Sequence, residues 1–299
     1  MKETLLSLTI ILAVLAASGA GCGETSSGTG TLELYLTDAP TDAENVTGVY
    51  IAINEIQHHL DGQWTTCEEF EGPETYNLLE LTGGNSTLLG DLTLPAGHYT
   101  QIRFMLDIPE IGPPPANPGC YIEFADNSTA PLFVPSGGET GYIAIGQFTV
   151  PINGEVEVTA DFDVRKAVVT MNSYYILVPT IRLIVNDQAG SIRGHITNNS
   201  GYTDVIAFAY EDGTWAETED DDPAAGQSRF PNSVTSAKME GEGGYVLAFL
   251  AAGTYDLAVA GYNGAEFGEV LGFVSDVVVE SGPTPAIVDI DTDALEDSL

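Results

Sequence analysis

A run of alternating apolar and polar residues at positions 156–165 (VEVTADFDVR) constrains the fold more than any other feature. Successive side chains of a β-strand point to opposite faces, so this run predicts a strand with one buried face and one polar face in water. The β-branched and aromatic runs 174–178 and 180–185 predict further strand, interrupted at Pro179. The whole stretch contains three of the eight basic residues, Arg165, Lys166 and Arg182.

The rest of the chain repeats the order strand, turn, strand, with no convincing helix. Asp61-Gly62 predicts a hairpin turn. At 299 residues the chain is longer than a single hydrophobic core usually serves. We therefore predict an all-β protein with two consecutive antiparallel β-sandwich domains. The other expected strands lie at 31–40, 49–57, 99–106, 142–150, 190–197, 204–210, 244–250 and 252–260.

Several motifs of the first half resemble the DUF4382 family. They are DFDVRKAVV and YYILVPTIRLI in 161–184, and TLELYLTDAP, VYIAINEIQ and LPAGHYTQIRFML earlier in the chain. The resemblance covers about residues 31–186. It implies an exported, mostly lipid-anchored domain, but it carries no activity.

The second half resembles a carboxypeptidase-regulatory-like module, a small transthyretin-like β-sandwich. The motifs are GSIRGHIT at 190–197, GYVLAFL at 244–250 and AGTYDLAVA at 252–260. This resemblance implies a spacer or a carbohydrate-binding-like fold. The expected organisation is a signal peptide at 1–21, a tether at 22–30, the two domains at 31–187 and 188–290, and an acidic tail at 291–299. An acidic loop at 211–233 is expected to be mobile, and the last residues to fray.

The N-terminus has the features of an export signal. Lys2 precedes an apolar segment at 5–17 that is too short to span a bilayer, and small residues lead to Cys22. This arrangement is similar to a lipoprotein signal, in which the cysteine is acylated and anchors the protein to the membrane of the cell envelope. Gly19 departs from the leucine usual at that position, so ordinary cleavage after Ala20 is the alternative.

Two cysteines remain in the expected oxidising compartment. Cys67 and Cys120 are predicted to form a disulfide, with two separate, partly buried thiols as the alternative.

The formal net charge of −36 excludes nucleic acid as a partner, because nucleic-acid affinity comes from Lys and Arg at phosphates. It also argues against adsorption to anionic lipid. The acidity has two interpretations: solubility in a salty or crowded exterior, or an acidic surface that collects Ca²⁺ or cationic partners.

Catalytic and metal motifs are sparse. The chain has no H-E-x-x-H, C-x-x-C or G-x-S-x-G motif. Asp289, Asp291 and Asp293 resemble the start of an EF-hand loop, but Ala294 replaces the required glycine and the twelfth position is missing. No cofactor is therefore expected, apart from a looser Ca²⁺ site at these residues or at the acidic run 220–222. The alternative is a solvated acidic tail.

One charged cluster stands out in the first half. Asp161, Asp163, Arg165 and Arg182 are expected on the polar strand face, where they form either a charged cross-strand ladder or a face that contacts a ligand. Exposed aromatic residues that could stack on sugar rings are Trp64, Tyr174, Tyr175 and Trp215.

The sequence thus predicts a non-enzymatic, lipid-anchored, extracytoplasmic binding protein with a glycan or an envelope protein as its ligand. One alternative is a structural spacer or assembly component of an envelope apparatus. The other is a hydrolase with dispersed carboxylates.

Overall fold

The computed structural model describes residues 28–39, 45–107, 119–133, 140–171, 174–178, 180–199, 201–224 and 226–299. The expected signal peptide, Cys22 and most of the tether lie outside these residues. No helix in this described part of the chain has the length and hydropathy needed to cross a bilayer.

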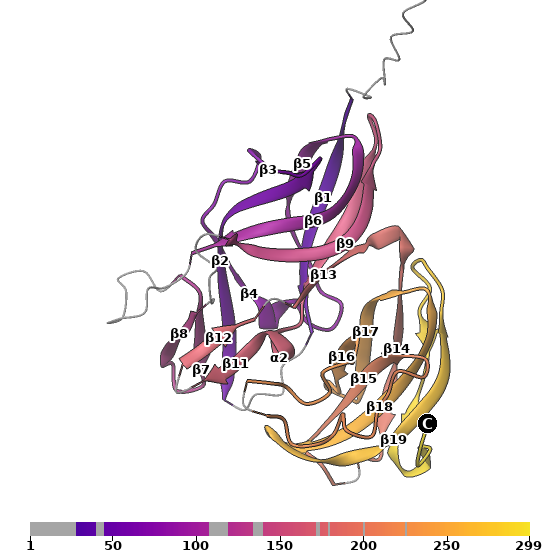
Figure 1. Ribbon diagram of the computed structural model, residues 1–299. Coiled ribbons are helices and arrows are strands. Elements are labelled where there is room, and N and C mark those ends of the chain that lie inside the picture. Colours follow the sequence, from indigo (N-terminus) through magenta and orange to yellow (C-terminus); the bar gives the residue numbers. More distant parts are fainter. Residues whose placement is uncertain are drawn as a thin grey trace, which may run out of the picture.

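The chain forms two groups of strands, one after the other, as Figure 1 shows, and this confirms the all-β prediction. We call residues 28–185 the N-terminal half and residues 189–299 the C-terminal half. The N-terminal strands are β1 (Thr29–Asp38), β2 (Val46–Leu60), β3 (Gln63–Thr66), β4 (Glu74–Asn77), β5 (Thr87–Pro95), β6 (Gly97–Leu106), β7 (Tyr121–Phe124), β8 (Thr129–Phe133), β9 (Tyr142–Val150), β10 (Glu155–Phe162), β11 (Val168–Met171), β12 (Tyr174–Leu177) and β13 (Ile181–Val185). The C-terminal strands are β14 (Ala189–Thr197), β15 (Asp204–Glu211), β16 (Thr235–Lys238), β17 (Gly244–Ala251), β18 (Gly253–Asn263), β19 (Glu266–Val279), β20 (Ala286–Ile287) and β21 (Ile290–Asp291). Short helical turns are η1 (Leu78–Leu81), α2 (Val164–Ala167), η2 (Asn186–Gln188) and η3 (Thr292–Ala294).

The N-terminal half is one 13-stranded sheet that encloses a single hydrophobic core. Its strands alternate as expected: in β1, Leu32, Leu34 and Leu36 are fully buried. Most neighbouring strands are antiparallel, but β1 pairs with β10, β8 with β12 and β9 with β13 in parallel. Parallel neighbours need a long crossover between them, and the alternation within one strand does not show which distant strand will lie beside it. The expected antiparallel sheet is therefore a mixed one.

The C-terminal half is a β-sandwich. One sheet contains β17, β14, β20 and β21, and the other contains β16, β15, β18 and β19. Apolar residues of both sheets fill the space between them, among them Ile192 and Leu247 from the first and Val205 and Leu257 from the second.

Two segments of the C-terminal half, the acidic loop and the acidic tail, make specific contacts with the strands. The acidic loop before β16 covers the outer face of β15 and β18, where Phe230 stacks on Phe208 at 4.1 Å between ring centroids. Glu219 in the same loop is buried and accepts a hydrogen bond from the Tyr210 hydroxyl. The acidic tail pairs through Glu296 with β19. These contacts come from a few apolar and hydrogen-bonding residues, which the acidic composition of the two segments does not reveal.

Candidate functional site

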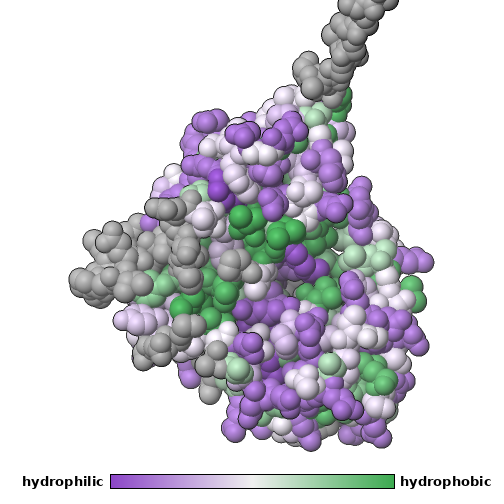
Figure 2. Space-filling view, viewed as in Figure 1, coloured by the Kyte–Doolittle hydropathy of each residue, from purple (hydrophilic) through white to green (hydrophobic). Residues whose placement is uncertain are grey.

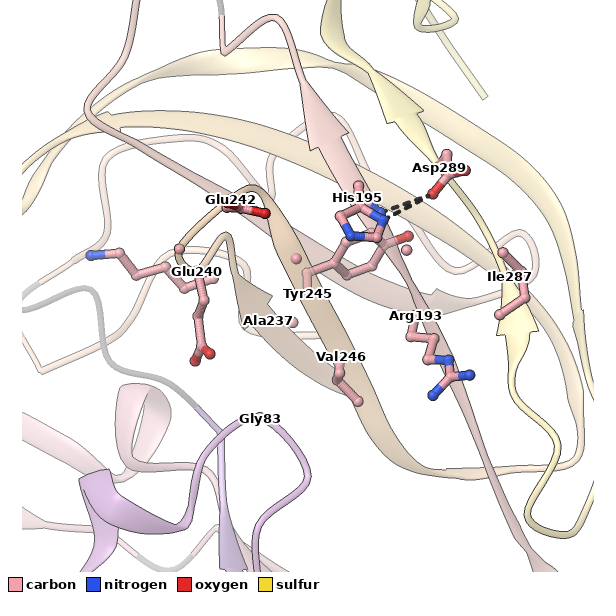
Figure 3. Close-up of a pocket in the computed structure, with 14 residues that line it drawn as sticks. Gly83, Arg193, His195, Ala237, Glu240, Glu242, Tyr245, Val246, Ile287 and Asp289 are labelled. Carbon is pink, nitrogen blue, oxygen red and sulfur yellow. Dashed lines mark hydrogen bonds and ion pairs between the residues drawn. The ribbon is translucent and has the colours of Figure 1, made fainter.

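A wide groove lies where the two halves meet, on the outer face of the β17-β14-β20 sheet (Figure 3). Its volume is about 880 Å³, and Gly83, from the loop after η1, contributes to it from the N-terminal half. We call it the junction groove. Its basic, acidic and histidine lining residues are Arg193, His195, Lys238, Glu240, Glu242 and Asp289.

Strand alternation places the groove residues. Alternate residues of β14 enter the core, so Arg193 and His195 face the groove. The register sets Arg193 opposite Val246 of β17 on one side and Ile287 of β20 on the other. The Ile287 side chain is 62% exposed, which makes it one of the most exposed large apolar residues described. Across the groove, the charged Arg193 therefore lies between two apolar residues, Val246 and Ile287.

The polar groups of the groove are partly held in place. The His195 backbone N–H donates to Asp289 Oδ1 at 3.0 Å, and the His195 ring Nδ1 lies 3.6 Å from the same oxygen. Tyr245 is buried beneath the groove, and its hydroxyl donates to the Val288 carbonyl at 2.8 Å. Burial, with a smaller contribution from Asp289, raises the pKa of Tyr245, so its hydroxyl stays neutral. Tyr245 thus closes the groove and offers no exposed ring.

The predicted charged cluster lies at the same junction. Asp161 on β10 stands directly opposite Arg182 on β13, and Arg182 Nη2 lies 2.6 Å from Asp161 Oδ2. This is the geometry expected for the cross-strand pair. The strand face that carries Asp161 does not face water, however, because Thr159, Asp161 and Asp163 are all buried.

Asp163 and Arg165 do not continue the strand. β10 ends at Phe162, and the Asp163 side chain caps α2 by accepting the Lys166 backbone N–H. An aspartate side chain that can cap a helical turn favours ending the strand. Here Asp163 does so, although the alternating sequence pattern continues to Arg165. The expectation that Asp161 and Arg165 share one strand face was therefore wrong.

Arg165 instead reaches into the C-terminal half. Its side chain is buried, and its guanidinium donates to Ser233 Oγ at 2.8 Å and to the carbonyls of Arg229 and Phe230. Lys166 Nζ lies 3.0 Å from Asp163 Oδ2 and donates to the Ser233 carbonyl. These contacts join the two halves through buried polar groups.

The carboxylates of the junction differ in their charge partners. Burial alone would raise the pKa of Asp163, but Arg165 and Lys166 outweigh it and hold that pKa below its usual range. Burial, with contributions from Asp161 and Asp163, raises the pKa of Asp38 well above its usual range, although the Val164 N–H opposes the shift.

The predicted disulfide is absent. Cys67 and Cys120 are both buried free thiols. The Cys67 N–H donates to the Ile56 carbonyl, whereas Cys120 Sγ accepts from the Ala52 N–H. Those two partners are four residues apart on β2, about 13 Å at the usual rise per residue. The two thiols are thus held at separate points along β2 and stay unpaired, so the predicted disulfide was wrong. Burial raises the pKa of each thiol to about 12.

The expected calcium ligands are not gathered. Asp289 accepts from His195, and Asp291 accepts from Asn198 and from the Asp293 N–H. Among the described residues, a different group of carboxylates lies close together. One carboxylate oxygen each from Glu33, Glu155 and Glu157 lies within 4.8 Å of the other two.

The carboxylates that do converge belong to β1 and β10, and Glu33 stands directly opposite Glu157 in the parallel register. A hydrogen bond with Glu33, followed by the charge of Glu33, raises the pKa of Glu155. The acidic run 220–222 lies elsewhere, and its Asp222 pairs with Arg229 at 2.7 Å.

The aromatic residues do not form one sugar-binding platform. The Arg103 guanidinium covers the Trp64 ring at 4.1 Å from its centroid. Trp215 packs against Tyr210, Phe230 and Phe273. Tyr174 lies against Phe133 on the distant β8–β12 part of the N-terminal sheet. None of these rings lines the junction groove.

A second exposed apolar surface lies on the N-terminal half. Figure 2 shows hydrophobic side chains gathered over β6, β9 and β13, and Ile145 on β9 is 64% exposed. Contiguous apolar surface of this kind is typical of contact with another protein.

Comparison with curated proteins found no match. Solved structures aligned with the chain include a leucine-rich repeat protein from Bacteroides thetaiotaomicron (13% identity, TM-score 0.23, 91% of this chain and 27% of that one). Others are the Bacillus anthracis TIE protein (12%, TM-score 0.20, 91% and 34%) and a minor pilin of Streptococcus agalactiae (11%, TM-score 0.22, 87% and 94%). The chain thus spans about a third or less of the first two proteins. TM-scores this low assign neither a fold nor an activity.

The comparison with protein families gives a specific result. The model described as "Domain of unknown function (DUF4382)" matches residues 29–179, which is half of the chain and includes β1 to β12. The chain therefore belongs to the DUF4382 family.

Proposed function

We propose that this protein is a non-enzymatic, extracytoplasmic interaction protein whose junction groove binds a polypeptide segment of another envelope protein. The observation that supports this most is the exposed Ile287, which lies on the groove floor between basic Arg193 and acidic Asp289. A polypeptide offers apolar side chains and both signs of charge, and this lining complements both.

The alternatives receive less support from the groove. Sugar rings bind by stacking on exposed aromatic faces, and Tyr245, the aromatic ring of the groove, is buried. A general acid of a hydrolase usually sits in an apolar pocket, whereas Glu240, Glu242 and Asp289 are exposed.

The groove makes a testable prediction. Replacing Ile287 with aspartate should weaken binding of a groove peptide at least tenfold, because burial of one such side chain is worth about 1.5–3 kcal/mol. Peptides are selected from a random phage-displayed library against the intact protein, and their dissociation constants are measured for both forms.

Val278→Asp is the matched control, because Val278 is also 62% exposed on the C-terminal half but lies outside the groove. It should leave peptide affinity unchanged. Equal losses in the two variants, or a library without binders beside a glycan array with binders, would contradict the proposal.

We extend the proposal to the organisation of the chain. A regulatory-like module at 188–290 is supported by the two glycines of its G-x-I-x-G motif. A Cβ on Gly190 would meet the Glu280 carbonyl at 2.1 Å, and one on Gly194 would meet the Val288 carbonyl at 1.8 Å. The motif therefore has a physical role, which is to let the chain before and after β20 pack closely against β14.

The membrane anchor is a separate expectation. Cys22 should be the lipidated N-terminus of the mature protein, since an apolar segment and small residues lead to it. Mass spectrometry of the membrane fraction should find an acylated Cys22, and Cys22→Ser should move the protein to the soluble fraction. A mature chain that begins at Gly21 would exclude the anchor.

A further inference from the structure

A small cavity lies between the two halves, beside the junction groove. Its volume is about 10 Å³, which is room for one water-sized occupant. Gly83 and Val246 line both the cavity and the groove. We call it the junction cavity. Its polar side chains are Thr37, Asp38 and Asp161 from the N-terminal half and Thr235 and Ser236 from the C-terminal half.

Two buried oxygen atoms at this cavity have no hydrogen-bond partner among the described residues. Asp38 is 5% exposed; its Oδ1 accepts the Val164 N–H at 2.9 Å, but its Oδ2 is unpaired. Ser236, from β16, is 3% exposed, and its Oγ is also unpaired. Buried polar atoms in native proteins are almost always paired, so two such atoms at one cavity indicate an occupant.

The charges nearby leave Asp38 uncompensated. Arg182 is engaged with Asp161, and Arg165 and Lys166 both lie within ion-pair distance of Asp163. Within the part of the chain that the structure describes, no cationic side chain lies within ion-pair distance of Asp38. A buried carboxylate without a positive partner is strongly unfavourable, so without a cation Asp38 keeps its proton, in line with its raised pKa, and a bound cation would replace that proton.

We propose that the junction cavity is a metal-ion site, in which Asp38 Oδ2 and Ser236 Oγ bind a single calcium-class cation. Carboxylate and hydroxyl oxygens are hard ligands, which suit Ca²⁺ rather than a soft transition metal. Asp161 and Thr235 supply further oxygens at the same cavity. Mg²⁺ usually keeps several of its waters, for which a cavity of this size has no room. Because Asp38 and Ser236 belong to different halves, the bound ion would link them.

The test is a set of thermal melts of the intact protein in Na⁺, Mg²⁺ and Ca²⁺ at matched ionic strength. Saturating Ca²⁺ should raise Tm by about 5 °C, and Mg²⁺ by much less. Asp38→Asn keeps an oxygen for the Val164 N–H while it removes the charge, so this variant should fold and lose the calcium-specific shift. Ser236→Ala, a second and milder variant, should reduce the shift.

A matched control separates this site from the surface carboxylates. The double variant Glu33→Gln/Glu157→Gln dismantles the exposed acidic cluster of β1 and β10, and it should keep the full shift. Equal wild-type melts in Na⁺ and Ca²⁺ would overturn the proposal and leave the cavity to a water molecule. A shift that survives in Asp38→Asn, or that disappears in the double variant, would also overturn it. All melts use protein without peptide, so the result does not depend on what the junction groove binds.

Discussion

Arg165→Ala is expected to destabilise the protein by about 3–5 kcal/mol. The substitution removes a buried guanidinium that donates to three acceptors of the C-terminal half, and it leaves Asp163 with Lys166 as its remaining close cation. Removing one partner of a buried ion pair costs more than the pair itself contributes, because the other charge and the acceptors stay buried.

The two tryptophans let the experiment follow each half. Trp64 lies on β3 of the N-terminal half, and Trp215 lies in the loop that covers β15 and β18 of the C-terminal half. Single-tryptophan variants unfolded in urea should give coincident transitions in the wild-type background. With Arg165→Ala the midpoints should fall and separate, because the contact that couples the halves is lost.

The control for Arg165 is Arg193→Ala, which removes one positive charge from an exposed position and should change stability by less than about 0.5 kcal/mol. If Arg165→Ala changes the free energy of unfolding no more than Arg193→Ala does, and the transitions of the two halves still coincide, then Arg165 does not couple the halves.

Gly194→Ala should destabilise the C-terminal half by about 3 kcal/mol or more and abolish peptide binding in the groove. The added Cβ would lie 1.8 Å from the Val288 carbonyl oxygen, and the three atoms nearest to it, from Val288 and Asp289, all belong to backbone. Backbone cannot yield as a flexible side chain does, so the segment that contains Ile287 must move away from β14. Urea unfolding and peptide affinity measure the two effects.

Gly244→Ala is the matched control in the same groove. Gly244 lies opposite Gly194's neighbour His195, and a Cβ there would meet no atom within 4 Å. Gly244→Ala should change the free energy of unfolding by less than about 1 kcal/mol. The change should be stabilising if alanine fits the backbone conformation at this position. Equal losses for the two variants would show that the glycines matter for flexibility rather than for close packing.

Local pattern was enough to predict the strands, since each strand's alternation is written in its own residues. The pattern could not show that β10 lies beside β1, because that pair joins residues more than a hundred positions apart. The alternation through Arg165 also misled, because it does not show that Asp163 caps a turn. The motif glycines at 190 and 194 did indicate a structural feature of the second half. They are needed because the segments before and after β20 pack closely against β14 at these two positions.

The junction groove itself was not predicted. Arg193 and His195 belong to no chemical motif of the sequence, and Asp289 was singled out only as a possible calcium ligand. The three residues line one groove only because β20 lies beside β14. Ile287 has no distinguishing signal in the sequence, because its neighbours Ala286, Val288 and Ile290 are apolar as well and pack against the core. The Asp38 site depends equally on contacts between the halves, which no local pattern contains.

The position of β20 has a consequence for the order in which this protein matures. β14 has its antiparallel partner once β17 is synthesised, but its other edge stays open until residues 286–291 have left the ribosome. The groove floor is thus completed only after β14 and β17, the other strands of its sheet, have been made. A chain cut short before Ala286 would keep nearly all of both cores and display an unpaired strand edge in place of a binding site, which is a surface prone to self-association.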